Sequence, residues 1–213
     1  MNTNNTKNII KCQALIRGYL FRKKQPLTSL KLRKLLFHIE NINERKQTQL
    51  DYYKKNNSSK EILYYVELAG KSFGEKYMEH IAREYFKLDK KKDTTHDHVK
   101  LSKTIEQKSA RYHANGADWK WQHIEMKHDF DYLLLCGLDF QSIKFFITCK
   151  KNLEKLIQLK IITGQGKRIN GFAEPQQGYW FSRNDFKKKN ILFNDYFQEI
   201  KNEKDLVNYI QNN

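Results

Sequence analysis

The stretch Thr104-Ile105-Glu106-Gln107-Lys108-Ser109-Ala110 has the pattern of an extended strand, and it decides the fold class that we predict. Successive side chains of a strand point to opposite faces, so Glu106 and Lys108 share one face and Ile105 points to the other. The same spacing also occurs as a solvated surface pair, which contributes about 0–1 kcal/mol. The surrounding sequence therefore decides between a surface ion pair and a site for chemistry.

A second strand is predicted just upstream of the first. Residues 98–101 alternate polar and apolar side chains, and residues 102–103 suit a turn between two strands. The upstream strand then begins at Asp97, and pairing would bring Asp97 beside Glu106. Two carboxylates can hold a hard divalent cation through oxygen, and Lys108 could orient an attacking water. We expect Mg²⁺ at this point, with Mn²⁺ as an alternative.

The composition describes a folded and strongly basic protein. Its 213 residues include 39% hydrophobic and 13% aromatic side chains, enough to fill a core. The formal net charge of +16 predicts a polyanionic partner, because such a field concentrates nucleic acid or anionic membrane at the surface. Lysine and asparagine are both abundant, so a biased genome composition would also account for part of the charge. We expect double-stranded DNA as the partner.

Cysteine spacing and the first residues predict an intracellular protein. Cys12, Cys136 and Cys149 are far apart, so neither a zinc ribbon nor a disulfide framework is indicated. Residues 1–6 lack the apolar core of a signal peptide, and no apolar run approaches about 18 residues. We expect a reducing compartment, either the cytoplasm or nucleus of a host cell or a virion, and no membrane-spanning segment.

Two parts of the chain are predicted from its pattern. Residues 8–49 are basic and carry apolar side chains near helical period, and residues 56–59 have the composition of a linker. We therefore expect a basic helical extension at residues 1–57 and an enzyme domain at residues 58–213.

Part of the extension resembles a calmodulin-binding helix. In residues 12–22, the residues that match the spaced positions of an IQ motif are Gln13, Arg17, Gly18 and Arg22. Cys12 stands where the motif usually has an aliphatic residue. The resemblance implies a calmodulin-type partner, although a basic helix of this kind could instead hold DNA phosphates or dock on the enzyme domain.

A capped helix is predicted before the two strands. Residues 72–75 read Ser-Phe-Gly-Glu, the form of a capping box, and apolar residues then recur at helical spacing. Glu75 has a structural role in this cap, whereas Glu79, one turn later, could project toward the predicted cation site. A solvent-exposed helix charge is the alternative for Glu79.

Further strands follow the Glu-x-Lys strand. They are predicted at residues 131–135 and 144–147, with a turn at residues 139–142 and a helix at residues 152–160. A helix followed by several strands and then mixed elements indicates the α/β class, with a mixed central sheet flanked by helices.

This order of elements, with an aspartate on one strand and Glu-x-Lys on the next, resembles the PD-(D/E)XK nucleases, which have the restriction-endonuclease-like fold. The resemblance covers about residues 72–147, and the residue before Asp97 departs from the proline in the family's name. It implies that Asp97, Glu106 and Glu79 hold the metal and that Lys108 contacts the scissile phosphate or the water. Residues 108–112, 121–124 and 131–134 are also similar to segments of type II restriction enzymes and of related nucleases of large DNA viruses. The resemblance therefore implies a sequence-specific, metal-dependent DNA endonuclease.

Target recognition is expected in a glycine-rich loop of the C-terminal part. Amide and guanidinium side chains read base edges, whereas lysines hold phosphates. The residues that carry such side chains are Gln165, Lys167, Arg168 and Asn170 in the loop, with Arg111 and Gln122 as further contacts. A flexible surface loop is the alternative, and Gln122 also suits a polar cap beside two tryptophans. Cleavage of both strands at a symmetric site would favour a two-fold homodimer.

Two other functions fit parts of the sequence. The first is a nuclease in which a histidine activates water beside a metal, as in HNH enzymes; the histidines concerned are His96, His98, His113, His123 and His128. Histidines at alternate strand positions, however, would put Asp97 on the opposite face. The second is a non-catalytic module that binds DNA or a calmodulin-type protein through the basic N-terminal helix.

Overall fold

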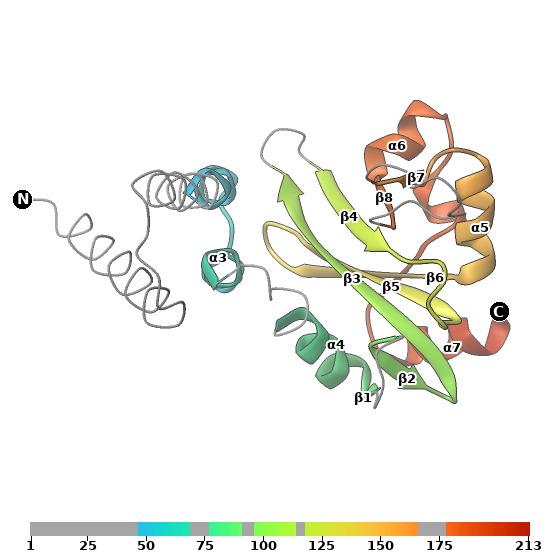
Figure 1. The fold of residues 1–213 in the computed structure, drawn as a ribbon. Coiled ribbons are helices and arrows are strands. Elements are labelled where there is room, and N and C mark those ends of the chain that lie inside the picture. The colour runs from blue at the N-terminus through green and yellow to red at the C-terminus, as the bar shows by residue number, and fades with distance from the viewer. Residues whose placement is uncertain (1–46, 69–76, 91–95, 114–117, 166–177) are drawn as a thin grey trace, which may run out of the picture. The chain divides into compact units, whose positions relative to one another are not determined.

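The computed structural model describes residues 47–68, 77–90, 96–113, 118–165 and 178–213 (Figure 1). The chain divides into two compact units, residues 1–51 and 52–213. Three predicted features lie outside the described residues: the IQ-like helix, the capping box at residues 72–75, and the part of the recognition loop that carries Lys167, Arg168 and Asn170.

Helices and strands are interspersed along the second unit, after a helical segment at residues 47–55. The helices are α3 (Lys60–Leu68), α4 (Glu79–Phe86), α5 (Lys150–Gln158), α6 (Arg183–Lys188) and α7 (Glu203–Asn212), with a 3-10 turn η2 (Phe193–Asp195). The strands are β1 (Asp89–Lys90), β2 (His98–Lys100), β3 (Lys103–His113), β4 (Asp118–Ile124), β5 (Tyr132–Leu138), β6 (Ile143–Cys149), β7 (Thr163–Gly164), β8 (Tyr179–Ser182) and β9 (Gln198–Ile200). Among the described helices, none is long and apolar enough to cross a membrane.

A mixed central sheet organises the second unit (Figure 1). Its main path runs β7-β8-β4-β3-β5-β6-β9, while β2 pairs with the first part of β3 and β1 pairs with β2. β3 and β5 are parallel, with Ile105 opposite Tyr132, and every other described pairing is antiparallel. The predicted α/β class, with a mixed sheet flanked by helices, is confirmed.

β2 and β3 form the hairpin that the alternating sequence predicts. His98 lies opposite Ile105, and Lys100 lies opposite Lys103. The loop consists of Leu101 and Ser102, whose φ angles of 51° and 62° are left-handed, as in the tight two-residue turns that suit twisted strands. The turn is therefore one residue earlier than predicted, because β3 already begins at Lys103.

One face of the sheet is covered by α4 and α7. It is the face of β3 that carries Ile105, since alternation and strand register place Tyr132 and Phe145 on the same side. Phe86 of α4 meets Phe145 edge to face with ring centroids 4.9 Å apart, and Tyr209 of α7 meets Tyr132 at 6.0 Å. Aromatic contacts therefore fix both helices on this face.

The other face of the sheet carries a large buried cluster. It is the face of β3 that carries Glu106, and it includes Leu133 and Leu135 of β5. Leu156 of α5 and Phe186 of α6 belong to the same cluster, so these helices cover this face. The central sheet thus lies between two layers, which explains why β5 is buried along its whole length.

The predicted boundary at residues 57/58 falls inside packed structure. Tyr53 is fully buried, and its hydroxyl donates a hydrogen bond to Leu138 O at 2.6 Å and accepts one from the Tyr112 N–H at 2.8 Å. The Ser59 N–H donates to Phe140 O at 3.0 Å. The residues just before position 58 therefore pack with the sheet and do not form part of a separate extension.

Candidate functional site

Glu106 and Lys108 lie on the face of β3 that the large buried cluster covers. The register of β5 places Leu133 beside Glu106 and Leu135 beside Lys108. The Glu106 side chain is 5% exposed and that of Lys108 is 21% exposed, and Lys108 Nζ lies 2.5 Å from Glu106 Oε1. The two residues therefore form a largely buried ion pair and not the solvated surface pair that their spacing also allowed.

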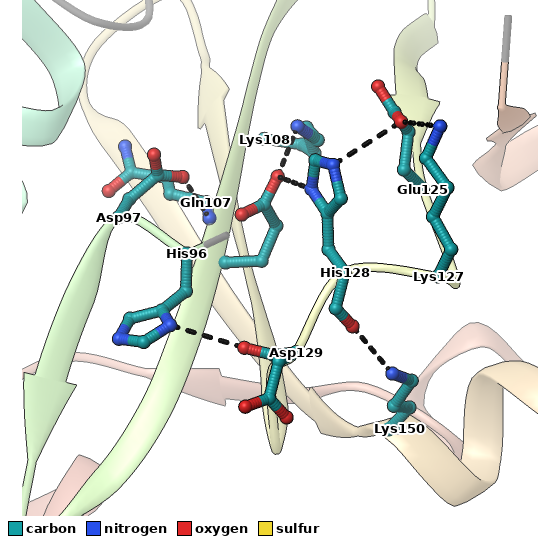
Figure 2. Close-up of polar contacts among 10 residues, drawn as sticks. His96, Asp97, Gln107, Lys108, Glu125, Lys127, His128, Asp129 and Lys150 are labelled. Carbon is teal, nitrogen blue, oxygen red and sulfur yellow. Dashed lines mark hydrogen bonds and ion pairs between the residues drawn. The ribbon is translucent and has the colours of Figure 1, made fainter. Parts of the chain in front are cut away.

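Asp97 lies next to this pair (Figure 2). It immediately precedes β2, and its main-chain N–H donates to Ile105 O at 3.0 Å. Its Oδ2 accepts a hydrogen bond of 2.7 Å from the main-chain N–H of Gln107. Because Gln107 stands between Glu106 and Lys108, the structure brings together the two carboxylates and the lysine.

Burial and neighbouring charges act together on Glu106. Burial raises the pKa of its carboxyl group above the usual value, and the negative charge of Asp97 raises that pKa further. The ammonium group of Lys108 opposes both effects but does not cancel them. A carboxylate with such a raised pKa beside a second carboxylate is typical of functional sites, although structural ion pairs show it as well.

A turn after β4 brings His128 to the same carboxylate (Figure 2). Its Nδ1 lies 3.9 Å from Glu106 Oε1, and its Nε2 lies 3.3 Å from Glu125 Oε2. The His128 N–H donates to Glu125 O at 3.1 Å, and Lys150 Nζ donates to His128 O at 2.7 Å. In the sequence His128 is one histidine of several and Glu125 is not singled out, so this part of the site was missed.

The His96-Asp97-His98 triplet does not form one cluster. His96 Nδ1 lies 3.1 Å from Asp129 O, whereas His98 is buried with its Nε2 2.8 Å from Gln107 Oε1. Burial lowers the pKa of His98, which disfavours its charged form. Of the other histidines considered for HNH chemistry, His123 is exposed on β4, and the side chain of His113 lies outside the described residues. The histidine beside the carboxylates is instead His128.

Glu79 is not gathered with Asp97 and Glu106. It begins α4, and its Oε2 lies 3.7 Å from Arg83 Nη1 one helical turn later. α4 buries Ala82 and Phe86, and Phe86 packs on the sheet face opposite to Glu106. The structure therefore gives Glu79 a partner on its own helix, and the part in metal binding that the resemblance implies for it stays a prediction.

Three predicted DNA contacts lie within the described residues. Gln122 is exposed on β4, and Gln165 follows β7, where its N–H donates to Gly178 O at 2.8 Å. Arg111 is partly buried near the end of β3, and burial lowers the pKa of its guanidinium group. Of these three, Gln122 has the side chain most open to a ligand.

The donor set at Asp97 and Glu106 suits a divalent cation. Both side chains are hard oxygen donors, and a positive ion would offset the repulsion from Asp97 that adds to burial in raising the pKa of Glu106. In the part of the chain that the structure describes, no three histidine, cysteine, aspartate or glutamate side chains are already arranged to hold a metal ion. The two carboxylates are therefore the core of a candidate site that further ligands would have to complete.

The comparison with family models identifies one short segment. The model of the IQ calmodulin-binding motif matches residues 6–25, which include Gln13, Arg17 and Arg22 and lie outside the described residues. The IQ resemblance predicted from the sequence is thereby confirmed. The search of curated proteins finds no match to the chain.

Proposed function

We propose that this protein is a divalent-cation-dependent DNA endonuclease of the restriction-endonuclease-like class. The observation that carries the proposal is the carboxylate of Asp97, which accepts a hydrogen bond from the peptide N–H between Glu106 and Lys108. Two carboxylates and an ammonium group at one point are the groups that metal-dependent phosphodiester hydrolysis uses. The net charge of +16 supports a polyanionic substrate.

Each residue has its own role in the proposed reaction. Asp97 and Glu106 would hold Mg²⁺ or Mn²⁺. The ion would act as a Lewis acid on the phosphate and would lower the pKa of the attacking water. Lys108, whose ammonium group lies 2.5 Å from Glu106, would turn to the scissile phosphate and orient the attacking water in line with phosphorus. Its positive charge would then offset the charge that develops on the phosphate oxygens.

Cleavage of duplex DNA by purified protein in Mg²⁺ or Mn²⁺ tests this proposal. Glu106→Gln and Lys108→Met keep the approximate size of each side chain and should each reduce the rate by about 10²-fold or more. Lys103→Met removes a more exposed lysine of the same strand and should leave the rate near that of the wild type. Cleavage that persists at full rate in both site variants would reject the proposed site.

A second function, binding of a calmodulin-type protein, is favoured by the family match over residues 6–25. A basic amphipathic helix binds such partners by placing its apolar face in a hydrophobic groove. Pulldown on immobilised calmodulin, with and without Ca²⁺, should capture the wild type and not Arg17→Ala. Lys31→Ala, a charge change outside the matched segment, serves as the control, and equal capture of both variants would count against the IQ segment as the binding element.

A further inference from the structure

The turn between β4 and β5 carries a histidine that the proposed reaction does not yet use. We propose that His128 is a ligand of the cation site and binds the cation through Nδ1, together with Glu106. Glu125 holds the imidazole ring in the tautomer whose Nδ1 is free of hydrogen. This inference rests on the proposed function, since it concerns the cation that Glu106 is proposed to hold. It adds a nitrogen donor to a site otherwise made of oxygen.

Glu125 determines which ring nitrogen of His128 carries the hydrogen. Glu125 Oε2 lies 3.3 Å from His128 Nε2 and 3.0 Å from Lys127 Nζ. Because this carboxylate is paired with the ammonium group of Lys127, it acts as a hydrogen-bond acceptor toward the ring. Nε2 of the neutral ring is then the protonated nitrogen, and the lone pair lies on Nδ1.

Nδ1 is placed as a ligand would be. It is buried and has no hydrogen-bond partner among the described residues, a state that is uncommon for a polar atom. Its distance of 3.9 Å from Glu106 Oε1 is too long for a hydrogen bond. A metal ion bound to both atoms at about 2.0–2.2 Å would bring them to about 3.0–3.6 Å, so a small movement of either side chain would complete the contact.

The backbone around His128 presents the ring in a fixed position. The turn is closed by the 3.1 Å hydrogen bond from the His128 N–H to Glu125 O, and Lys150 Nζ donates to His128 O at 2.7 Å. Lys150 Nζ also lies 4.6 Å from the ring centroid of Phe130. Metal-binding histidines usually donate their second N–H to a carboxylate, which fixes the ring and raises its basicity, and Glu125 stands in that position.

A nitrogen ligand changes which cation the site should prefer. Mg²⁺ binds oxygen ligands and keeps much of its water, whereas imidazole suits first-row transition metals. We therefore expect the protein to bind Mn²⁺ more tightly than Mg²⁺. The preference should be lost when the imidazole of His128 is removed.

Electron spin-echo envelope modulation of the full chain loaded with Mn²⁺ tests the assignment, because a coordinated imidazole produces a ¹⁴N signal. His128→Gln should abolish that signal and weaken Mn²⁺ binding, measured by calorimetric titration, by about 10–100-fold. Glu125→Gln should keep the signal but weaken binding about tenfold, since an amide oxygen accepts the same hydrogen bond without a charge. His80→Gln, at an exposed position of α4, is the matched control and should change neither measurement.

The outcomes separate this inference from the proposed function. A ¹⁴N signal that survives His128→Gln, Mn²⁺ affinity that is unchanged by it, or a wild type that binds no Mn²⁺ would each overturn the role of His128. DNA cleavage that depends on Glu106 and Lys108 would still stand after the first two results. Conversely, a signal that depends on His128 in a protein that cuts no DNA would support the metal site and reject the nuclease.

Discussion

Removing one oxygen atom from Tyr53 should destabilise the sheet domain strongly. In Tyr53→Phe the Tyr112 N–H loses its acceptor, which lies 2.8 Å away, and an unsatisfied buried donor costs about 1–3 kcal/mol. Leu138 O loses its 2.6 Å hydrogen bond from Tyr53 but keeps the 3.0 Å hydrogen bond from the indole of Trp119. The loss of this one hydrogen bond should therefore cost about 0.5–1.5 kcal/mol. The sum is a loss of roughly 2–4 kcal/mol in the free energy of unfolding, because the ring itself still packs.

Urea unfolding followed by fluorescence measures this change, and thermal unfolding should show a midpoint lower by about 4–16 °C. Tyr52→Phe, the same substitution one residue earlier, serves as the control and should lie within about 0.5 kcal/mol of the wild type. Equal stability of the two variants would refute the role assigned to the Tyr53 hydroxyl.

Three further changes test other parts of the structure. A chain that starts at residue 58 lacks Tyr53 and should unfold at lower urea concentration than one that starts at residue 47; equal midpoints would contradict the packing of this segment. Glu106→Gln should reduce cleavage by about 10²-fold or more yet unfold at a higher urea concentration than the wild type at neutral pH. Because the folded pKa of Glu106 is raised, wild-type stability should fall relative to this variant as pH rises from acidic to neutral, and the opposite trend in urea titrations would refute the assignment. In Gly137→Ala the added Cβ would lie 2.7 Å from the buried ring of Trp119, so we expect a loss of about 1–3 kcal/mol by chemical unfolding, and a neutral result would contradict it.

Local alternation was sufficient to predict the β2–β3 hairpin and its main consequence. A short turn fixes the register of two strands, so the position of Asp97 close to Glu106 follows from residues 97–108 alone. The strand predicted at residues 131–135 is part of β5, because a short continuous apolar run is typical of a strand covered on both faces.

The histidine side of the site depends on a long-range pairing that no local pattern contains. β5 lies parallel to β3, with Tyr132 opposite Ile105, so the connection after β4 must return to the start of β3. That return places His128 near Glu106. With the parallel pairing known, a histidine four residues before β5 would have been a candidate ligand, but the sequence offered no means of choosing this pairing.

The helix after the capping box was predicted, but not which part of its apolar stripe would be buried. Tyr85 and Phe86 both lie on this broad stripe in the sequence. In the structure Phe86 is buried and Tyr85 is 54% exposed. Glu79 pairs with Arg83 one helical turn later, and the role in metal binding implied for it by the resemblance stays a prediction.

The buried pair of Glu106 and Lys108 is better explained by chemistry than by stability. Placing an ion pair beside Leu133 and Leu135 carries a desolvation penalty that its attraction often fails to repay, and apolar replacements of similar size are often neutral or stabilising. Nor is the pair needed to set the register of β3, which the two-residue turn and the pairing with β5 already determine. A charged pair at this position, with the carboxylate of Asp97 against the same stretch of backbone, therefore supports the proposed charged ligand, and a cation bound to phosphate would satisfy all three groups.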